Sequence, residues 1–303
     1  MRRKIQKCIL EKRIDRTVLT AALMLTGTFL FCDTTMAQVN EPLMSLAEYP
    51  VVDGSTACIP LCENLALRLT GCSQAEAEET LDSYSNTNPS YLHLAGGSCD
   101  IIFSYEPAQE TVEELKAYDP LNSVPIGKDA LVFITNVSNP VESLTVDQIR
   151  DIFAGEITNW SEVGGADMEI RAFQRPETSG SQTLMRKLVM GDTVMEESDV
   201  ELVPTMEGMI EALKEYDNSV NSIGFSVYYY ASQMYEQPDL KFLQIDGVEP
   251  SNDSIRSGKY PLINEFYCVT NEQSSDSAKK IQEWMVTEEG QQFVEECGYV
   301  AMQ

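Results

Sequence analysis

The sequence contains a single histidine, His93, and has few basic residues, with 21 Lys and Arg against 48 Asp and Glu. Nucleophilic catalysis needs a nucleophile beside a base, so one histidine in an unpatterned segment argues against an enzyme. The net charge of −27 argues against binding to nucleic acid or anionic lipid, because both require a positively charged surface. Apolar runs are short as well, and the longest, from Val18 to Phe31, falls below the roughly 20 residues that span a bilayer.

The N-terminal residues have the order of a secretory signal peptide, namely a basic region, an apolar core and a small-residue cleavage site. Seven Lys and Arg lie between residues 2 and 16, and Thr35-Met36-Ala37 follows the apolar run. We expect cleavage after Ala37, which gives a periplasmic, extracellular or surface-associated protein. Loss of residues 1–37 removes seven basic and three acidic residues and changes the net charge from −27 to −31. The alternative is an uncleaved membrane anchor.

The chain has eight cysteines, and their pairing is open. Six lie beyond the leader: Cys58, Cys62, Cys72, Cys99, Cys268 and Cys297. An even number in an exported chain permits disulfides, but the sequence cannot choose among the pairings. Cys58 and Cys62 have a spacing that metal sites also use, yet no second ligand pair follows, so we expect apolar core residues and neither a metal nor a cofactor. Cys32 in the leader is preceded by Phe31, which argues against lipidation.

Apolar strands and amphipathic helices alternate beyond residue 50, which predicts an α/β protein. We expect strands at 50–53, 101–104, 130–135, 170–173 and 222–227. Cys58, Cys62, Leu65 and Leu69 form the apolar stripe of one helix. Thr145, with Gln148 three positions later, predicts a capping box that opens another helix, and Gly155 suits its end.

Three loops share one pattern, in which a strand or turn is followed by small hydroxyl residues and a helix. They cover 53–56, 85–90 and 178–181. Unpaired N–H groups at a helix N-terminus bind anions without basic side chains, although Ser and Thr also cap helices that bind nothing. Arg175 precedes the third loop, and its guanidinium is either a bidentate ligand of an oxyanion or a solvated surface group.

Four stretches resemble the phosphate-binding component of bacterial phosphate ABC transporters. They are 144–149 leading into 153–160 with Gly164-Gly165, Arg175 through Ser179-Gly180-Ser181, Ile223-Gly224-Phe225, and Glu288-Glu289-Gly290-Gln291. The resemblance implies a two-lobed type II periplasmic-binding-protein fold with hinge crossings at Ala130–Thr135 and Ile223–Val227. Residues 38–132 plus 226–303 would form lobe 1, and residues 133–225 lobe 2.

The same resemblance implies a monomer that captures a small anion, phosphate or similar, and delivers it to a membrane permease. The ligand positions that carry over are Ser55, Thr56, Thr87, Arg175, Ser179, Gly180 and Ser181.

One corner departs from the family pattern. Where phosphate binders place an Asp that accepts a proton from the ligand, this chain has Tyr105, and the acid follows as Glu106. We include both in the predicted site, since Glu106 can reach the cleft if the strand end twists. The alternatives are a surface ion pair for Glu106 and, for the whole chain, a sensory or surface interaction module that does not serve transport.

Overall fold

The computed structural model describes residues 42–82, 84–196, 203, 205–215, 219–234 and 238–302. The predicted signal peptide at 1–37, with Cys32, lies outside these residues. No helix in the described part of the chain is long and apolar enough to cross a membrane.

The described strands form one seven-stranded sheet and a separate two-stranded sheet. In the large sheet the order is β1-β2-β9-β3-β6-β5, with β7 also paired to β3, and the small sheet joins β4 to β8. The strands are β1 (Val52–Gly54), β2 (Ile101–Tyr105), β3 (Asn122–Asn136), β4 (Ser143–Leu144), β5 (Arg171–Ala172), β6 (Ser222–Val227), β7 (Leu240–Phe242), β8 (Gln244–Ile245) and β9 (Ile263–Thr270). The expected strands are thus present, and the α/β fold class is confirmed.

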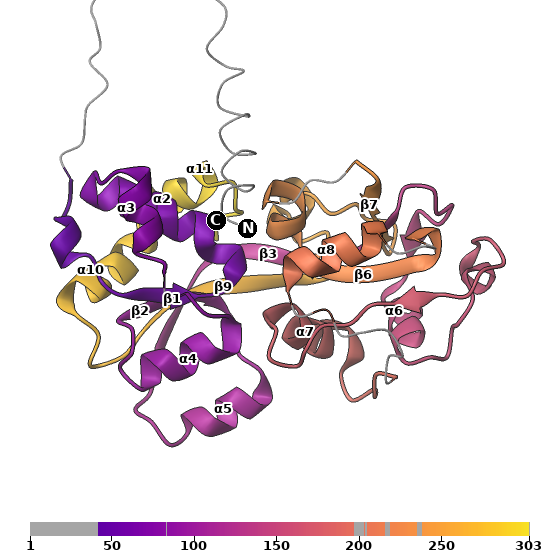
Figure 1. Ribbon diagram of the computed structural model, residues 1–303, viewed down its shortest axis with the longest axis horizontal. Helices are drawn as coiled ribbons and strands as arrows, with labels where there is room; N and C mark the ends of the chain where they lie inside the picture. The colour runs from indigo at the N-terminus through magenta and orange to yellow at the C-terminus, as the bar shows by residue number, and fades with distance from the viewer. Residues whose placement is uncertain are drawn as a thin grey trace, which may run out of the picture.

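The long strand β3 joins the two halves of the molecule (Figure 1). Its first part, from Asn122 to Ala130, pairs with β9, and from Leu131 onward it pairs with β6 instead. The sheet therefore passes through both halves without a break. The two predicted crossings correspond to the second part of β3 and to β6.

Helices cover the sheet on both sides of this passage. In Figure 1, α2, α3, α4, α5, α10 and α11 surround one half, and α6, α7 and α8 the other. The helices are α2 (Ile59–Thr70), α3 (Gln74–Glu79), α4 (Thr87–Ala95), α5 (Gln109–Leu115), α6 (Val146–Phe153), α7 (Gly180–Met185), α8 (Met206–Glu215), α9 (Asn252–Arg256), α10 (Asp276–Met285) and α11 (Glu288–Glu296).

Local signals explain where several helices begin and end. Thr145 and Gln148 form the predicted capping box of α6, with Gln148 N donating to Thr145 Oγ1 at 3.1 Å and Thr145 N to Gln148 Oε1 at 2.9 Å. Gly155 beyond α6 has a φ of 76°. Cys58, the N-cap residue of α2, and Cys62, within α2, are both fully buried, as the apolar-stripe prediction requires. The six described cysteines are all free.

The course of β7 and β8 bears on the lobe boundaries. β7 pairs with Ile134–Asn136 of β3, and β8 pairs with β4. These strands thus lie with the half that contains β6, although the sequence-based boundary assigned everything after residue 225 to the other half.

Candidate functional site

A buried carboxylate fixes the first two predicted loops relative to each other. Asp53 is 2% exposed, and its oxygens accept hydrogen bonds from Ser85 N at 2.6 Å and Ser85 Oγ at 2.7 Å. Nδ1 of His93, on α4, lies 2.8 Å from Asp53 Oδ2. The loop after β1 and the N-terminal region of α4 therefore share one anchor. This role of Asp53 was not predicted, although the residue lies in the predicted 53–56 loop, because its partners are more than 30 positions away in the sequence.

Glycine is required where β1 meets the first loop. Gly54 has a φ of 151°, and a Cβ there would lie 2.0 Å from the carbonyl oxygen of Phe103. The next amide, Ser55 N, donates to the same carbonyl at 2.9 Å. β1 and β2 therefore approach closely at this end, where Ser55 begins the short 3-10 helix η2 (Thr56–Cys58).

At least one hydroxyl-bearing residue in each of the first two loops is buried. Ser55 is 3% exposed, and its side chain forms no capping hydrogen bond. Thr87, the first residue of α4, is 2% exposed. Thr56 Oγ1 lies 3.9 Å from Sδ of Met206, the first residue of α8 in the other half of the molecule. The first loop thus contacts both halves.

The third loop carries the basic residue and two serines. Ser179 Oγ and Ser181 Oγ lie 3.1 Å apart at the start of α7, and the Ser179 side chain does not cap the helix. Arg175 is 5% exposed, and burial lowers its pKa to about 10. The guanidinium is therefore still cationic at neutral pH. Arg175 N donates to Oε1 of Gln182 on α7 at 3.2 Å, so a buried cation and two serines belong to one loop at the start of a helix, a combination suited to an anion.

The second and third loops meet across the two halves. A Cβ on Gly180 would lie 2.3 Å from Thr87 Oγ1, so only glycine permits this approach. Asn88 Nδ2 donates to the carbonyl of Thr178 at 2.9 Å, while Asn88 Oδ1 accepts from Ala108 N at 2.7 Å. The N-termini of α4 and α7 consequently face each other, and Asp53 ties the first loop to them.

Tyr105 does not join this group. It is the last residue of β2, is fully buried, and donates a hydrogen bond to Asp129. Its side chain packs in the main core with Phe266, so we remove it from the predicted ligand residues. The expectation was wrong because β2 continues one residue beyond Ser104, and Tyr105 faces the core as part of the strand.

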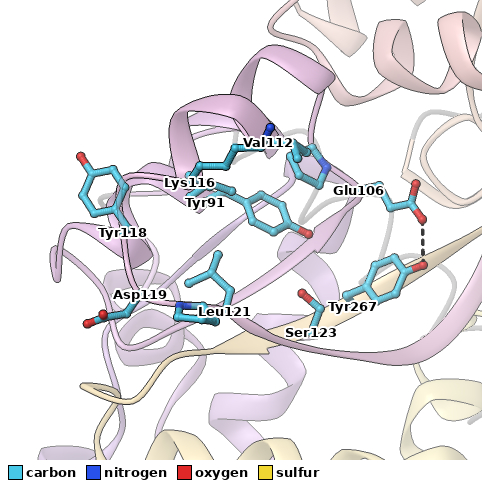
Figure 2. Close-up of a pocket in the computed structure, with 12 residues that line it drawn as sticks. Tyr91, Glu106, Val112, Lys116, Tyr118, Asp119, Leu121, Ser123 and Tyr267 are labelled. Carbon is cyan, nitrogen blue, oxygen red and sulfur yellow. Dashed lines mark hydrogen bonds between the residues drawn. The ribbon is translucent and has the colours of Figure 1, made fainter.

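Glu106 directly follows β2 and lies between the two halves of the molecule. Its carboxylate forms an ion pair with Lys187, on the π-helix η4 (Arg186–Met190) that continues α7. Tyr267 Oη of β9 donates to Glu106 Oε1 at 3.1 Å, and Figure 2 shows the two side chains turned toward each other. The geometry thus favours the ion-pair alternative for Glu106.

Two buried serines outside the predicted loops add further hydroxyls. Ser104 in β2 is fully buried and Ser226 in β6 is 1% exposed, and neither Oγ has a hydrogen-bond partner in the described part of the chain. Buried hydroxyls in native proteins are usually paired, so each is available to a bound solute or water. The sequence signal was the small polar residue at the end of an apolar strand.

A separate cavity opens beside Glu106 (Figure 2). Its volume is about 560 Å³, and Tyr91, Val112, Leu115, Tyr118 and Tyr267 contribute much of its wall. None of the three predicted hydroxyl loops, at 53–56, 85–90 and 178–181, lines this cavity. Among the described residues, no group of three or more His, Cys, Asp or Glu is placed to hold a metal.

Comparison with known proteins agrees with this architecture. The family model of a PBP superfamily domain matches residues 79–289. The phosphate-binding protein PstS of Borreliella burgdorferi is 26% identical over 278 residues, which cover 88% of this chain and 92% of the relative. PstS of Bacillus subtilis is also 26% identical, over 56% of this chain and 55% of the relative.

Solved structures show the same fold. A putative phosphate ABC transporter substrate-binding protein from Clostridium perfringens, with bound phosphate, superposes with a TM-score of 0.64 at 22% identity, over 84% of this chain and 99% of that chain. An ABC-type phosphate transport receptor from Vibrio cholerae gives a TM-score of 0.61 at 23% identity, over 82% of this chain and 98% of that chain. With the family match over most of its length, the chain belongs to the PBP superfamily.

Proposed function

We propose that this chain is an extracytoplasmic solute-binding protein that captures a small oxyanion, most favourably phosphate, for an ABC transporter. Its relatives are named phosphate-binding proteins, and one solved structure of the same fold carries bound phosphate. Its role is binding and delivery to a membrane permease rather than catalysis. Export by the predicted signal peptide and action as a monomer belong to the same proposal.

The observation that carries the proposal is the burial of Arg175 on the loop that leads to Ser179 and Ser181. Arg175 is 5% exposed in a chain of net charge −27, so the surface field repels anions and capture depends on short-range donors. Ser179 and Ser181 come from the same loop, and Thr87 faces Gly180 from the other half. Hydrogen bonds to charged groups contribute about 1.5–3 kcal/mol each, so several give micromolar affinity or better.

The proposed ligand set is Ser55, Thr56, Thr87, Arg175, Ser179, Gly180 and Ser181. Because these residues come from both halves, a ligand between them links the halves and favours closure by hinge motion. We place lobe 1 at 38–132 and from about 249 to 303, and extend lobe 2 to about residue 248, because β7 and β8 pair with β3 and β4.

Which oxyanion binds best depends on whether a carboxylate in the site accepts a hydrogen bond from the protonated oxygen of the ligand. Near neutral pH phosphate retains a proton and sulfate does not, so a carboxylate at the ligand repels sulfate. Glu106 is paired with Lys187 and Tyr267, which favours a site of moderate selectivity.

Isothermal titration of the mature protein with phosphate, arsenate, sulfate, molybdate and organic phosphates tests the proposal. We expect phosphate and arsenate to bind at micromolar or lower Kd and sulfate to compete measurably. Absence of binding by every anion in the series would refute the transport receptor and leave the sensory or surface module as the remaining function for this fold.

A further inference from the structure

We propose that Glu106 and Lys187 form a latch between the lobes, which holds the cleft closed and slows release of the ligand. The inference deepens the proposed function, because release of a trapped anion requires the lobes to separate. It gives Glu106 a conformational role in place of the ligand contact that its sequence position suggested.

The two ends of the latch belong to different lobes. Glu106 directly follows β2, which lies in the sheet with β1 and β9. Lys187 lies on η4, which is continuous with α7 and packs against α6. The pair therefore breaks whenever the lobes separate, whereas an ion pair within one lobe is unaffected by opening.

The latch is oriented by a third residue. Tyr267 Oη lies 3.1 Å from Oε1 of Glu106 and also 3.1 Å from Oε2 of Glu265. Lys187 contacts the other oxygen of Glu106, Oε2. The tyrosine hydroxyl thus positions the carboxylate toward the opposite lobe, which reduces the conformational entropy lost when the ion pair forms.

A second contact between the lobes, the hydrogen bond from Asn88, also stabilises the closed form without a ligand. Asn88 Nδ2 donates to the carbonyl of Thr178 at 2.9 Å, and Asn88 is 5% exposed. Among the described residues, the ion pair at Glu106 and the hydrogen bond at Asn88 therefore both cross between the lobes without a ligand. Closure in this protein has a component that is independent of the anion.

The expected size of the effect follows from exposure. The side chains of Lys187 and Glu106 are 51% and 40% exposed, so solvent screens the pair and its contribution is that of a surface ion pair. Loss of such a pair changes an equilibrium or rate constant about two- to five-fold. Because both charges are partly solvated, added salt weakens the latch.

The test is a double-mutant cycle with Glu106→Gln and Lys187→Met, which remove charge and approximately conserve size. We measure the rate of phosphate release by stopped flow and the Kd for phosphate and sulfate by titration. Each single variant should release phosphate about two- to five-fold faster, the double variant no faster than either single one, and 1 M NaCl should shrink the difference from wild type. The ratio of the phosphate and sulfate Kd values should not change.

Lys116→Met is the matched control. Lys116, the C-cap residue of α5, pairs with Glu113 of the same helix, and these side chains are 64% and 54% exposed. Removal of this pair within one lobe should leave phosphate release unchanged. Equal acceleration by Lys116→Met would overturn the latch, as would additive effects of the two latch substitutions. A change in the ratio of the phosphate and sulfate Kd values that occurs only in Glu106→Gln would also overturn the latch. Glu106 would then accept a hydrogen bond from the protonated ligand.

Failure of the proposed function is distinguishable from failure of the latch. If the wild type binds neither phosphate nor sulfate, the anion receptor is refuted and small-angle scattering without ligand decides the latch. Lys187→Met must then give a larger radius of gyration than the wild type and than Lys116→Met. Equal radii for all three proteins would overturn the latch.

Discussion

Tyr105 Oη donates a 2.7 Å hydrogen bond to Oδ2 of Asp129, and both side chains are essentially excluded from solvent. Asp129 also accepts from Ala130 N at 2.7 Å and from Tyr229 N at 3.1 Å. Ala130 is the last residue of β3 that pairs with β9, and Tyr229 follows β6, the neighbouring crossing strand. One carboxylate thus holds both chain segments together beside the hinge.

The buried Asp129 should make stability depend on pH. Burial raises the pKa of Asp129 to about 6, above its ordinary value of 3.8, so the folded state binds a proton more readily than the unfolded state. Stability should therefore fall as pH rises from about 4 to beyond 6, by on the order of 3 kcal/mol from this group. Urea unfolding of wild type and Asp129→Asn across pH 4–7.5 measures the difference, and the variant should lack this component.

Tyr105→Phe is the companion variant for Asp129. The tyrosine hydroxyl lowers the pKa of Asp129, so its loss should move the pH-dependent fall in stability to higher pH. A fall that stays in place in Tyr105→Phe, or persists in Asp129→Asn, would contradict the assignment.

Arg175 should dominate anion affinity. Arg175→Ala should weaken phosphate binding by about 2–5 kcal/mol, because truncation of one partner in a buried charge pair costs that much. Arg175→Lys should recover only part of the loss, since an ammonium lacks the planar fork. Titration calorimetry measures both variants, and urea unfolding without ligand should show a much smaller change. Wild-type affinity in Arg175→Ala would disprove the oxyanion site.

Gly180→Ala should interfere with closure. The new Cβ would lie 2.3 Å from Thr87 Oγ1, so the N-termini of α7 and α4 must separate. We expect at least tenfold weaker phosphate binding, about 1.4 kcal/mol, with no contraction in small-angle scattering when phosphate is added. Gly96→Ala, whose Cβ would lie 3.2 Å from Leu92 O within α4, is the control and should contract normally. Contraction of Gly180→Ala to the wild-type radius would contradict the contact.

Asp53 should position the first two loops without contacting the ligand. Asp53→Asn leaves Ser85 N and His93 with a weaker acceptor, and we expect a loss of about 1–3 kcal/mol in unfolding free energy together with weaker phosphate binding. His93→Gln, which removes one partner whose side chain is 46% exposed, should have a smaller effect on both. Chemical denaturation and titration calorimetry measure the pair of variants. An unchanged stability in Asp53→Asn would show that the anchor is dispensable.

Short-range sequence signals were sufficient for much of the fold. The capping box at Thr145, the stripe through Cys58 and Cys62, and the strand at 222–227 appear where they were expected, because each depends on neighbours within a few positions. The loop at Ser179 also begins a helix as predicted. These features need only periodicity and capping chemistry.

Contacts between distant segments were the features that the sequence did not reveal. β2 extends to Tyr105 because that residue pairs with Phe266 of β9, and no local signal marks this partner. Asp129 and Lys187 acquire their roles from residues more than 20 positions away. β7 likewise pairs with a strand that is far from it in the sequence, β3, and this pairing leads us to propose a later lobe boundary.

The order of strands also decides when the protein can finish folding during synthesis. β9 lies between β2 and β3, yet it leaves the ribosome after every other strand. Until β9 emerges, β2 and β3 have no strand between them with which to pair. The sheet of the half that contains β1 and β2 is therefore incomplete. Lobe 2, whose strands are already present, can condense first, because domains generally fold as their residues emerge. The nascent chain therefore stays incompletely folded almost to its end, because the half that contains β1 and β2 lacks its central strand until β9 has emerged.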